Sequence, residues 1–207
     1  MIFGPEDRET LRAILRWRRD VRHFRPDPVP APVLHGLVAA MDAAPSVGNA
    51  RPWRVIRVRD CALRAAVRAE FARCNAAAAQ GYAGARRDSY AALKLAGLDA
   101  APEQLAVFTV TDPAAGHGLG RATMPETLRQ STAMAIHSLW LAARVENLGL
   151  GMVSILDPRR IEAIFAVPPD WEFAAYLCLG YPEFTDDTPL LHRAGWQENL
   201  PSWWQDR

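Results

Sequence analysis

The chain has 207 residues, half of them hydrophobic, and a formal net charge of +1. This length and composition suit a single domain, residues 1–207, that can fill its own core. A net charge so close to zero provides no global field for nucleic acid or an anionic membrane, so we expect neither as a partner. No apolar run resembles a signal peptide or a membrane span, which predicts a cytoplasmic protein.

The first part of the chain predicts two helices and a strand. Residues 6–19 carry acidic side chains at their start and a partial apolar face, as expected for a helix. The prolines at 26, 28 and 30 predict an extended connection to a second helix over residues 31–43. A loop at 46–52 then precedes residues 53–58, which alternate apolar and basic side chains as a half-buried strand does.

Residues 61–93 are rich in alanine and are interrupted at Gly81 and Gly84. This pattern predicts two helices with a flexible joint. The segment 62–97 is our candidate for a helical lid, and an ordinary surface helical hairpin is an equally good interpretation.

The middle of the chain predicts a strand at 105–111 and a long helix from Pro125 to about Leu148. Between 133 and 145 this helix is apolar on almost every side, so it must be covered all round. A partner subunit is a plausible cover in so short a chain. His137 lies in this stretch, and we interpret it as a core histidine.

The last part predicts a strand at 151–156, a short helix after Asp157, and an apolar strand at 173–179. The tail from about 185 to 207 carries three tryptophans, which predicts that it docks on a surface. Scattered strands among helices favour an α+β domain over alternating βαβ units. The five histidines have no metal-ligand spacing, so we expect no metal site.

The segment Arg18-Arg19-Asp20-Val21-Arg22 places three arginines within five residues at the end of the first helix. Guanidinium groups form bidentate bonds with phosphate, so this cluster could hold one. From charge alone, a solvated basic surface is the better interpretation.

Sequence motifs favour the phosphate site over the solvated surface. The segment 18–22, followed by Phe24 and Pro26, resembles the opening motif of the nitroreductase-like flavoprotein superfamily. The loop Ala44-Pro45-Ser46-Val47-Gly48-Asn49-Ala50-Arg51-Pro52-Trp53 and the turn Gly149-Leu150-Gly151 are similar to it as well. Within the superfamily, the closer match is to its branch of aerobic 5,6-dimethylbenzimidazole synthases. That match is carried by 18–22, 94–98, 118–128 and 153–158.

The resemblance implies an intertwined homodimer with a central mixed sheet flanked by helices, and flavin mononucleotide (FMN) bound between the subunits. It implies a set of cofactor-binding residues: Arg18, Arg19, Asp20, Val21, Arg22, Ser46, Asn49, Lys94, Leu95, Val153, Ser154 and Arg193. The arginines of the first motif would hold the phosphate and ribityl chain. Lys94, the only lysine of the chain, would lie near the polar edge of the ring.

The implied reaction uses O2 to break reduced FMN into 5,6-dimethylbenzimidazole, the lower ligand of cobalamin, and a tetrose phosphate. We expect Asp20 to transfer protons and Ser154 to orient the reacting group by a hydrogen bond. Without the resemblance, Asp20 would be read as the partner of a nearby arginine, and Ser154 as the cap of the following helix.

Two other functions fit the same motifs. One is an NAD(P)H-dependent nitroreductase or dehalogenase that recycles its FMN, and the other is a protein that sequesters FMN without catalysis. The sequence shows no nicotinamide site, so our hypothesis is that a separate flavin reductase supplies the reduced FMN.

Overall fold

The computed structural model describes residues 1–93 and 97–207. Its helical segments are α1 (Pro5–Trp17), α2 (Ala31–Asp42), η1 (Val47–Asn49), α3 (Cys61–Ala79), α4 (Gly84–Ala92), α5 (Gly97–Ala100), α6 (Thr127–Val145), α7 (Pro158–Ile164) and α8 (Leu190–Arg193). Its strands are β1 (Trp53–Arg57), β2 (Glu103–Val110), β3 (Gly149–Val153) and β4 (Trp171–Gly180). The α+β class is therefore confirmed.

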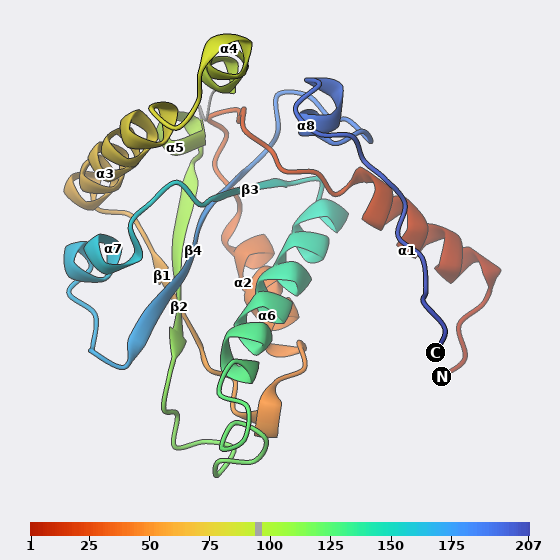
Figure 1. Ribbon diagram of the computed structural model, residues 1–207. Coiled ribbons are helices and arrows are strands. Elements are labelled where there is room, and N and C mark those ends of the chain that lie inside the picture. The colour runs from red at the N-terminus through yellow and green to blue at the C-terminus, as the bar shows by residue number, and fades with distance from the viewer. Residues whose placement is uncertain (94–96) are drawn as a thin grey trace.

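The four strands form one sheet in the order β1-β2-β4-β3 (Figure 1). The pairings β1–β2, β2–β4 and β3–β4 are all antiparallel. The parallel component of the expected mixed sheet is a single isolated bridge between Asp20 and Leu150, on the outer edge of β3.

Both faces of the sheet are covered by helices, which is why its central strands read as continuous apolar runs. On one face, Val107, Leu177 and Leu179 pack with α2 and α6. On the other face, Phe108 and Tyr176 pack with residues of α3, α5 and α7. Successive residues along β2 and β4 point to opposite faces of the sheet and thus fill two separate cores.

The alanine-rich region forms two helices, α3 and α4, with the break at Gly81–Gly84 that the sequence predicts. Asp60 caps α3 by accepting hydrogen bonds from the backbone N–H groups of Ala62 and Leu63. The following α4 lies above α3 at the top of the molecule (Figure 1).

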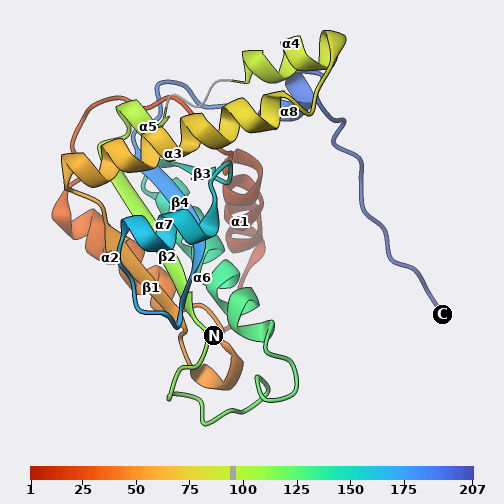
Figure 2. The same cartoon turned by 60° about the vertical axis from the view of Figure 1, so that its left-hand side comes forward.

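The long helix α6 buries one stripe, which includes Ala135, Leu139 and Ala143. Its other side stays open in the single chain, where Met134 is 40% exposed and Val145 is 57% exposed. The chain from the end of α8 to the C-terminus runs away from the body of the domain (Figure 2). Trp203 and Trp204 lie in this extended part, 75% and 95% exposed.

None of the helices in the described ranges, 1–93 and 97–207, is both long enough and apolar enough to cross a membrane.

Candidate functional site

The segment after α1 lies along the free edge of β3. The backbone N–H of Val21 donates to the carbonyl of Leu150 at 3.1 Å. Glycine at 151 makes this approach feasible, because a Cβ there would lie 2.1 Å from the carbonyl oxygen of Val21. A Cβ at Gly149 would meet the Val21 side chain at 2.7 Å. The two glycines of Gly149-Leu150-Gly151 therefore let the arginine segment rest directly on the sheet.

Asp20 is fixed by both of its carboxylate oxygens. Oδ1 accepts the backbone N–H of Met152 at 3.0 Å, and Oδ2 accepts Nε of Arg22 at 3.3 Å. The side chain is 36% exposed, so its carboxylate is oriented by the protein and still open to a ligand. The expected pairing of Asp20 with an arginine exists, and it accounts for only one of the two oxygens.

Ser154 follows the last residue of β3 and is exposed. It lies two residues beyond Met152, or about 7 Å along an extended chain. Between them, Val153 points into the core with 4% exposure. The alternative that Ser154 caps α7 is wrong, because Asp157 is the cap and accepts the backbone N–H groups of Arg159 and Arg160. Ser154 and Met152 are both exposed on the same side of the chain at the end of β3, and Asp20 binds the N–H of Met152.

The clustered arginines have different surroundings. Arg18 stacks over the Trp140 ring at 5.0 Å, and its Nε is buried with no hydrogen-bond partner among the described residues. Arg19 turns back and donates to the carbonyls of Leu15 and Arg16, at the C-terminal end of α1. Burial lowers the pKa of the Arg19 guanidinium, and the charge of Arg18 adds to the shift.

A small cavity of about 80 Å³ opens beside this segment. Its charged lining comprises four arginines and two aspartates: Arg19, Arg22, Arg144, Arg193, Asp20 and Asp186. Arg193 is ion-paired with Asp186. Four arginines against two aspartates leave an excess of positive charge, which suits a phosphate dianion. This charge excess fits the phosphate end of FMN.

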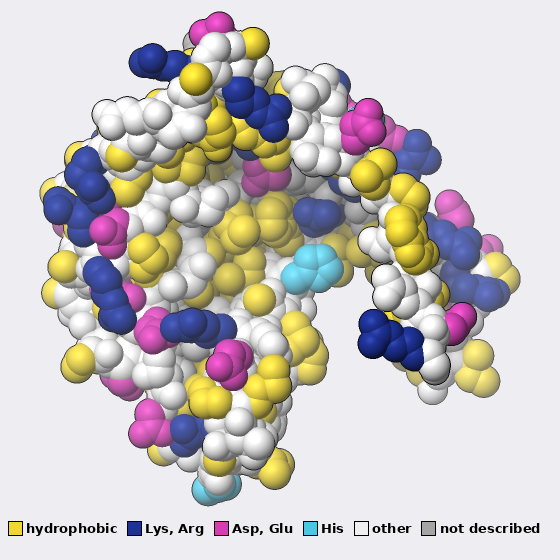
Figure 3. All heavy atoms as spheres, viewed as in Figure 1, with side chains coloured by type: hydrophobic (Ala, Val, Ile, Leu, Met, Phe, Trp, Pro, Cys, Tyr) yellow, Lys and Arg dark blue, Asp and Glu magenta, His cyan; other side chains and the backbone are white. Residues whose placement is uncertain are grey.

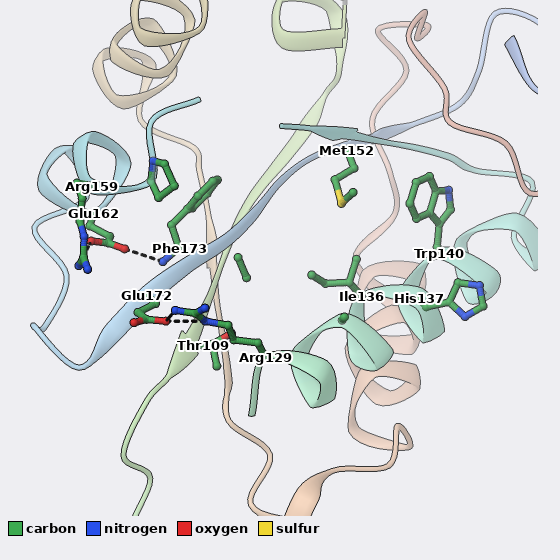
Figure 4. A pocket seen from close by; sticks show the side chains of 13 residues that line it. Thr109, Arg129, Ile136, His137, Trp140, Met152, Arg159, Glu162, Glu172 and Phe173 are labelled. Atoms are coloured by element: carbon green, nitrogen blue, oxygen red, sulfur yellow. Dashed lines mark hydrogen bonds and ion pairs between the residues drawn. The ribbon is translucent and has the colours of Figure 1, made fainter. Parts of the chain in front are cut away.

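A larger cavity of about 580 Å³ lies between α6, α7 and the strands. Figure 3 shows this side of the molecule as a hollow with many hydrophobic side chains. Met152 from β3, Trp140 from α6 and Phe173 from β4 line it (Figure 4). Trp140 thus lines the large, mainly apolar cavity and also stacks on Arg18 of the arginine segment.

The loop that carries Ser46 and Asn49 lies at the other end of α6. The backbone N–H of Val47 donates to Oγ of Ser131, near the start of α6, at 3.0 Å. Trp140, which contacts the arginine segment, is nine residues further on, or about 14 Å along the helix axis. A single chain therefore does not bring Ser46 and Asn49 to the arginines.

Within that loop, Ser46 Oγ accepts the backbone N–H of Arg51 at 3.1 Å. Asn49 is exposed and has a φ of +55°, so its backbone is held in the left-handed region. The predicted site residues Lys94 and Leu95 lie outside the described residues.

Sequence reasoning missed Trp140 and Arg144. Trp140 donates from Nε1 to the carbonyl of Arg19 at 3.3 Å, and Arg144 lines the small cavity. Their spacing of four residues puts both on one face of α6, and this spacing could have found them. The interpretation of His137 as a core residue is wrong. It is exposed and lines the large cavity, because α6 buries only the opposite stripe in a single chain.

Among the residues at 1–93 and 97–207, no cluster of three or more His, Cys, Asp or Glu side chains could hold a metal ion.

The model of the nitroreductase family matches residues 15–181, so the chain belongs to the nitroreductase family. The 5,6-dimethylbenzimidazole synthase of Rhodobacter capsulatus is 67% identical over 207 residues, 100% of both chains. The synthase of Rhodospirillum rubrum is 52% identical over 97% of this chain and 95% of its own length. Within the family, the chain therefore groups with the 5,6-dimethylbenzimidazole synthases.

Solved structures give the same fold. Iodotyrosine deiodinase bound to FMN and 3-iodo-L-tyrosine has a TM-score of 0.74 at 22% identity, covering 95% of this chain and 97% of that one. A BluB-like flavoprotein from Clostridium difficile has a TM-score of 0.64 at 19% identity, covering 95% and 94%. The nitroreductase-like fold expected from the sequence is confirmed.

Proposed function

We propose that this chain is an oxygen-dependent 5,6-dimethylbenzimidazole synthase whose substrates are reduced FMN and O2. Reduced FMN would supply both products, 5,6-dimethylbenzimidazole and a tetrose phosphate. Full-length identity of 67% to a synthase of that name supports the reaction. The observation that carries the proposal is Asp20, a carboxylate held within an arginine cluster by the N–H of Met152.

In this proposal the charged cavity binds the FMN phosphate. Arg22 and Arg193 line it directly, and Arg18, next to Arg19 in the chain, stacks on Trp140. Arg19 contributes its charge while its side chain caps α1. Arg144, which the sequence motifs do not include, adds a further positive charge from α6. Phosphate binding would therefore hold α1, α6 and the α8 region together.

We further propose that the active unit is an intertwined homodimer. The exposed side of α6 and the tail tryptophans present apolar surface that a second copy would cover. A two-fold partner would also bring its own Ser46 and Asn49 to the arginine segment. That arrangement explains why these residues lie at opposite ends of α6 in one chain.

The chemistry would occur beside β3. Asp20 would transfer a proton, Ser154 would orient the reacting group, and the backbone at Val21 and Val153 would border the ring. The apolar walls formed by Met152, Trp140 and Phe173 would exclude water. Lys94 and Leu95 remain proposed ring contacts on the sequence resemblance alone.

The whole chain is proposed to be one domain with a helical lid and a docking tail. Residues 62–97, which include α3 and α4, would form a lid over the bound substrate. Residues 185–207 would be the docking tail, fixed near its start by Trp196, whose ring lies 5.5 Å from Tyr82. A separate flavin reductase would supply the reduced FMN.

The variant Asp20→Asn tests the proposal, because it keeps the size of the side chain and removes the proton-transfer group. It should bind oxidised FMN within about twofold of wild type and form no 5,6-dimethylbenzimidazole, since amide oxygens can still accept the Met152 N–H. Undiminished product, measured by chromatography, would remove Asp20 from the mechanism.

The alternative of a flavin-recycling nitroreductase or dehalogenase predicts a different result. Such an enzyme would oxidise NADPH rapidly with a nitroaromatic or halogenated acceptor and leave the flavin intact. An FMN-sequestering protein would leave the flavin intact with no turnover at all.

A further inference from the structure

Glu70 is a charged residue that is covered by half-exposed arginines and lines neither cavity. It lies on α3 with 4% exposure. Its carboxylate accepts Nε and Nη2 of Arg73 at 2.9 and 2.6 Å, and Nε of Arg160 at 2.9 Å. It also accepts the thiol of Cys74 at 3.1 Å. A group with so many donors is firmly oriented.

The same carboxylate reaches the turn that carries Ser154. The backbone N–H of Asp157 points to Glu70 Oε1 at 3.4 Å. Asp157 in turn caps α7, and Nη2 of Arg73 lies 3.7 Å from its Oδ2. The residues from Ser154 to Asp157 are therefore anchored at their far end by α3.

Apolar packing supports the same anchor. Val67, one helical turn before Glu70 on α3, is fully buried in one core cluster with Leu156 and Ile161. Leu156 is the residue that enters the core between Ser154 and Asp157. Thus α3 holds this turn at two adjacent points, one apolar and one charged.

The carboxylate of Glu70 is held in its ionised form by its neighbours. Hydrogen bonds from Arg73 lower the pKa of Glu70 to about 2 against the opposing effect of burial. Burial and the neighbouring Glu70 raise the pKa of the Cys74 thiol, which stays a hydrogen-bond donor. An ion-pair cluster of this kind adds little net stability over apolar packing, but it fixes the orientation of the groups that it joins.

We infer that Glu70 is a positioning residue for the proposed fragmentation reaction: through Asp157 and Arg160 it sets the path of the Ser154 turn and joins that turn to α3. This inference rests on the proposed function of Ser154. It gives α3 a direct link to the turn that follows β3.

The inference is tested by mixing the variant Glu70→Gln with reduced FMN in air and measuring how much of the flavin is converted to product. A misplaced Ser154 should release intact oxidised FMN in place of products, so the fraction of flavin that becomes 5,6-dimethylbenzimidazole should fall about tenfold. Affinity for oxidised FMN, measured by fluorescence quenching, should change less than about twofold. A merely structural role would lower the amount of active protein and leave this fraction unchanged.

Two further variants keep the test decisive. Glu103→Gln is the control. It removes another buried, ion-paired carboxylate, the partner of Arg57, and should leave the fraction of flavin converted to 5,6-dimethylbenzimidazole at its wild-type value. Arg160→Met, at a side chain 61% exposed, removes one donor from Glu70 without unfolding the core and should lower the fraction about threefold. An unchanged fraction in both Glu70→Gln and Arg160→Met would overturn the inference.

Hydrogen exchange separates this inference from the proposed function. In Glu70→Gln, the Asp157 amide should exchange about tenfold faster than in wild type, whatever reaction the enzyme performs. Unchanged exchange would refute the anchor itself. Absence of the benzimidazole with wild-type protein would instead refute the proposed function.

Discussion

Gly151→Ala should damage both stability and flavin binding, although it adds one methyl group. The new Cβ would lie 2.1 Å from the carbonyl oxygen of Val21, so the chain at Asp20 and Val21 must move by about 1 Å to reach van der Waals contact. That shift would stretch the Val21 N–H bond to Leu150 and the Met152 N–H bond to Asp20. One neutral and one charge-assisted hydrogen bond together are worth about 3 kcal/mol.

We therefore expect the free energy of unfolding, measured in urea, to fall by about 3 kcal/mol. The Kd for FMN should rise about tenfold, since a displaced arginine segment loses the equivalent of one charge-assisted bond to phosphate. Gly36→Ala is the matched control. A Cβ there meets nothing within 4 Å, and alanine should stabilise α2 by up to ~1 kcal/mol. If Gly151→Ala matched this control in both stability and affinity, the contact between the arginine segment and β3 would not matter.

Three further outcomes follow from the structure. Trp196→Ala should raise amide exchange in α4 about tenfold with little change in the melting temperature, because it removes the ring that contacts Arg86 and Tyr90 of α4. The pKa of Glu70 is lowered from its ordinary value of 4.5 to about 2, so its stabilisation is complete above 4.5 and is lost as the pH falls toward 2. In Glu70→Gln, acid titration should therefore show a smaller loss of stability in that window. The double change Trp203→Ala and Trp204→Ala should weaken self-association at least about tenfold by analytical ultracentrifugation; an unaltered dimer would exclude the tail from the interface.

Local patterns in the sequence predict most of the fold. The break at Gly81–Gly84 divides α3 from α4, and the apolar run of β4 fits a strand buried on both faces. The boundaries are less accurate. β3 begins at Gly149, where the sequence suggests the end of a helix, because that glycine accommodates Val21.

The candidate site is less accessible from the sequence, because it depends on segments far apart in the chain. Motifs identify Asp20 and Ser154, but only the structure shows that Asp20 binds the N–H of Met152 on β3, two residues before Ser154. Helical periodicity gives the faces of α6 without saying what covers each face. For that reason the sequence alone favours a core position for His137 and gives no role to Trp140, whereas both line the large cavity.

The proposed reaction requires that reduced FMN is consumed and not recycled. The direct measurement mixes the purified protein with one equivalent of chemically reduced FMN in oxygenated buffer and quantifies the products by chromatography. We predict loss of the flavin with formation of one 5,6-dimethylbenzimidazole for each FMN consumed. Quantitative recovery of intact oxidised FMN, with or without NADPH turnover on a nitroaromatic, would contradict the proposed reaction.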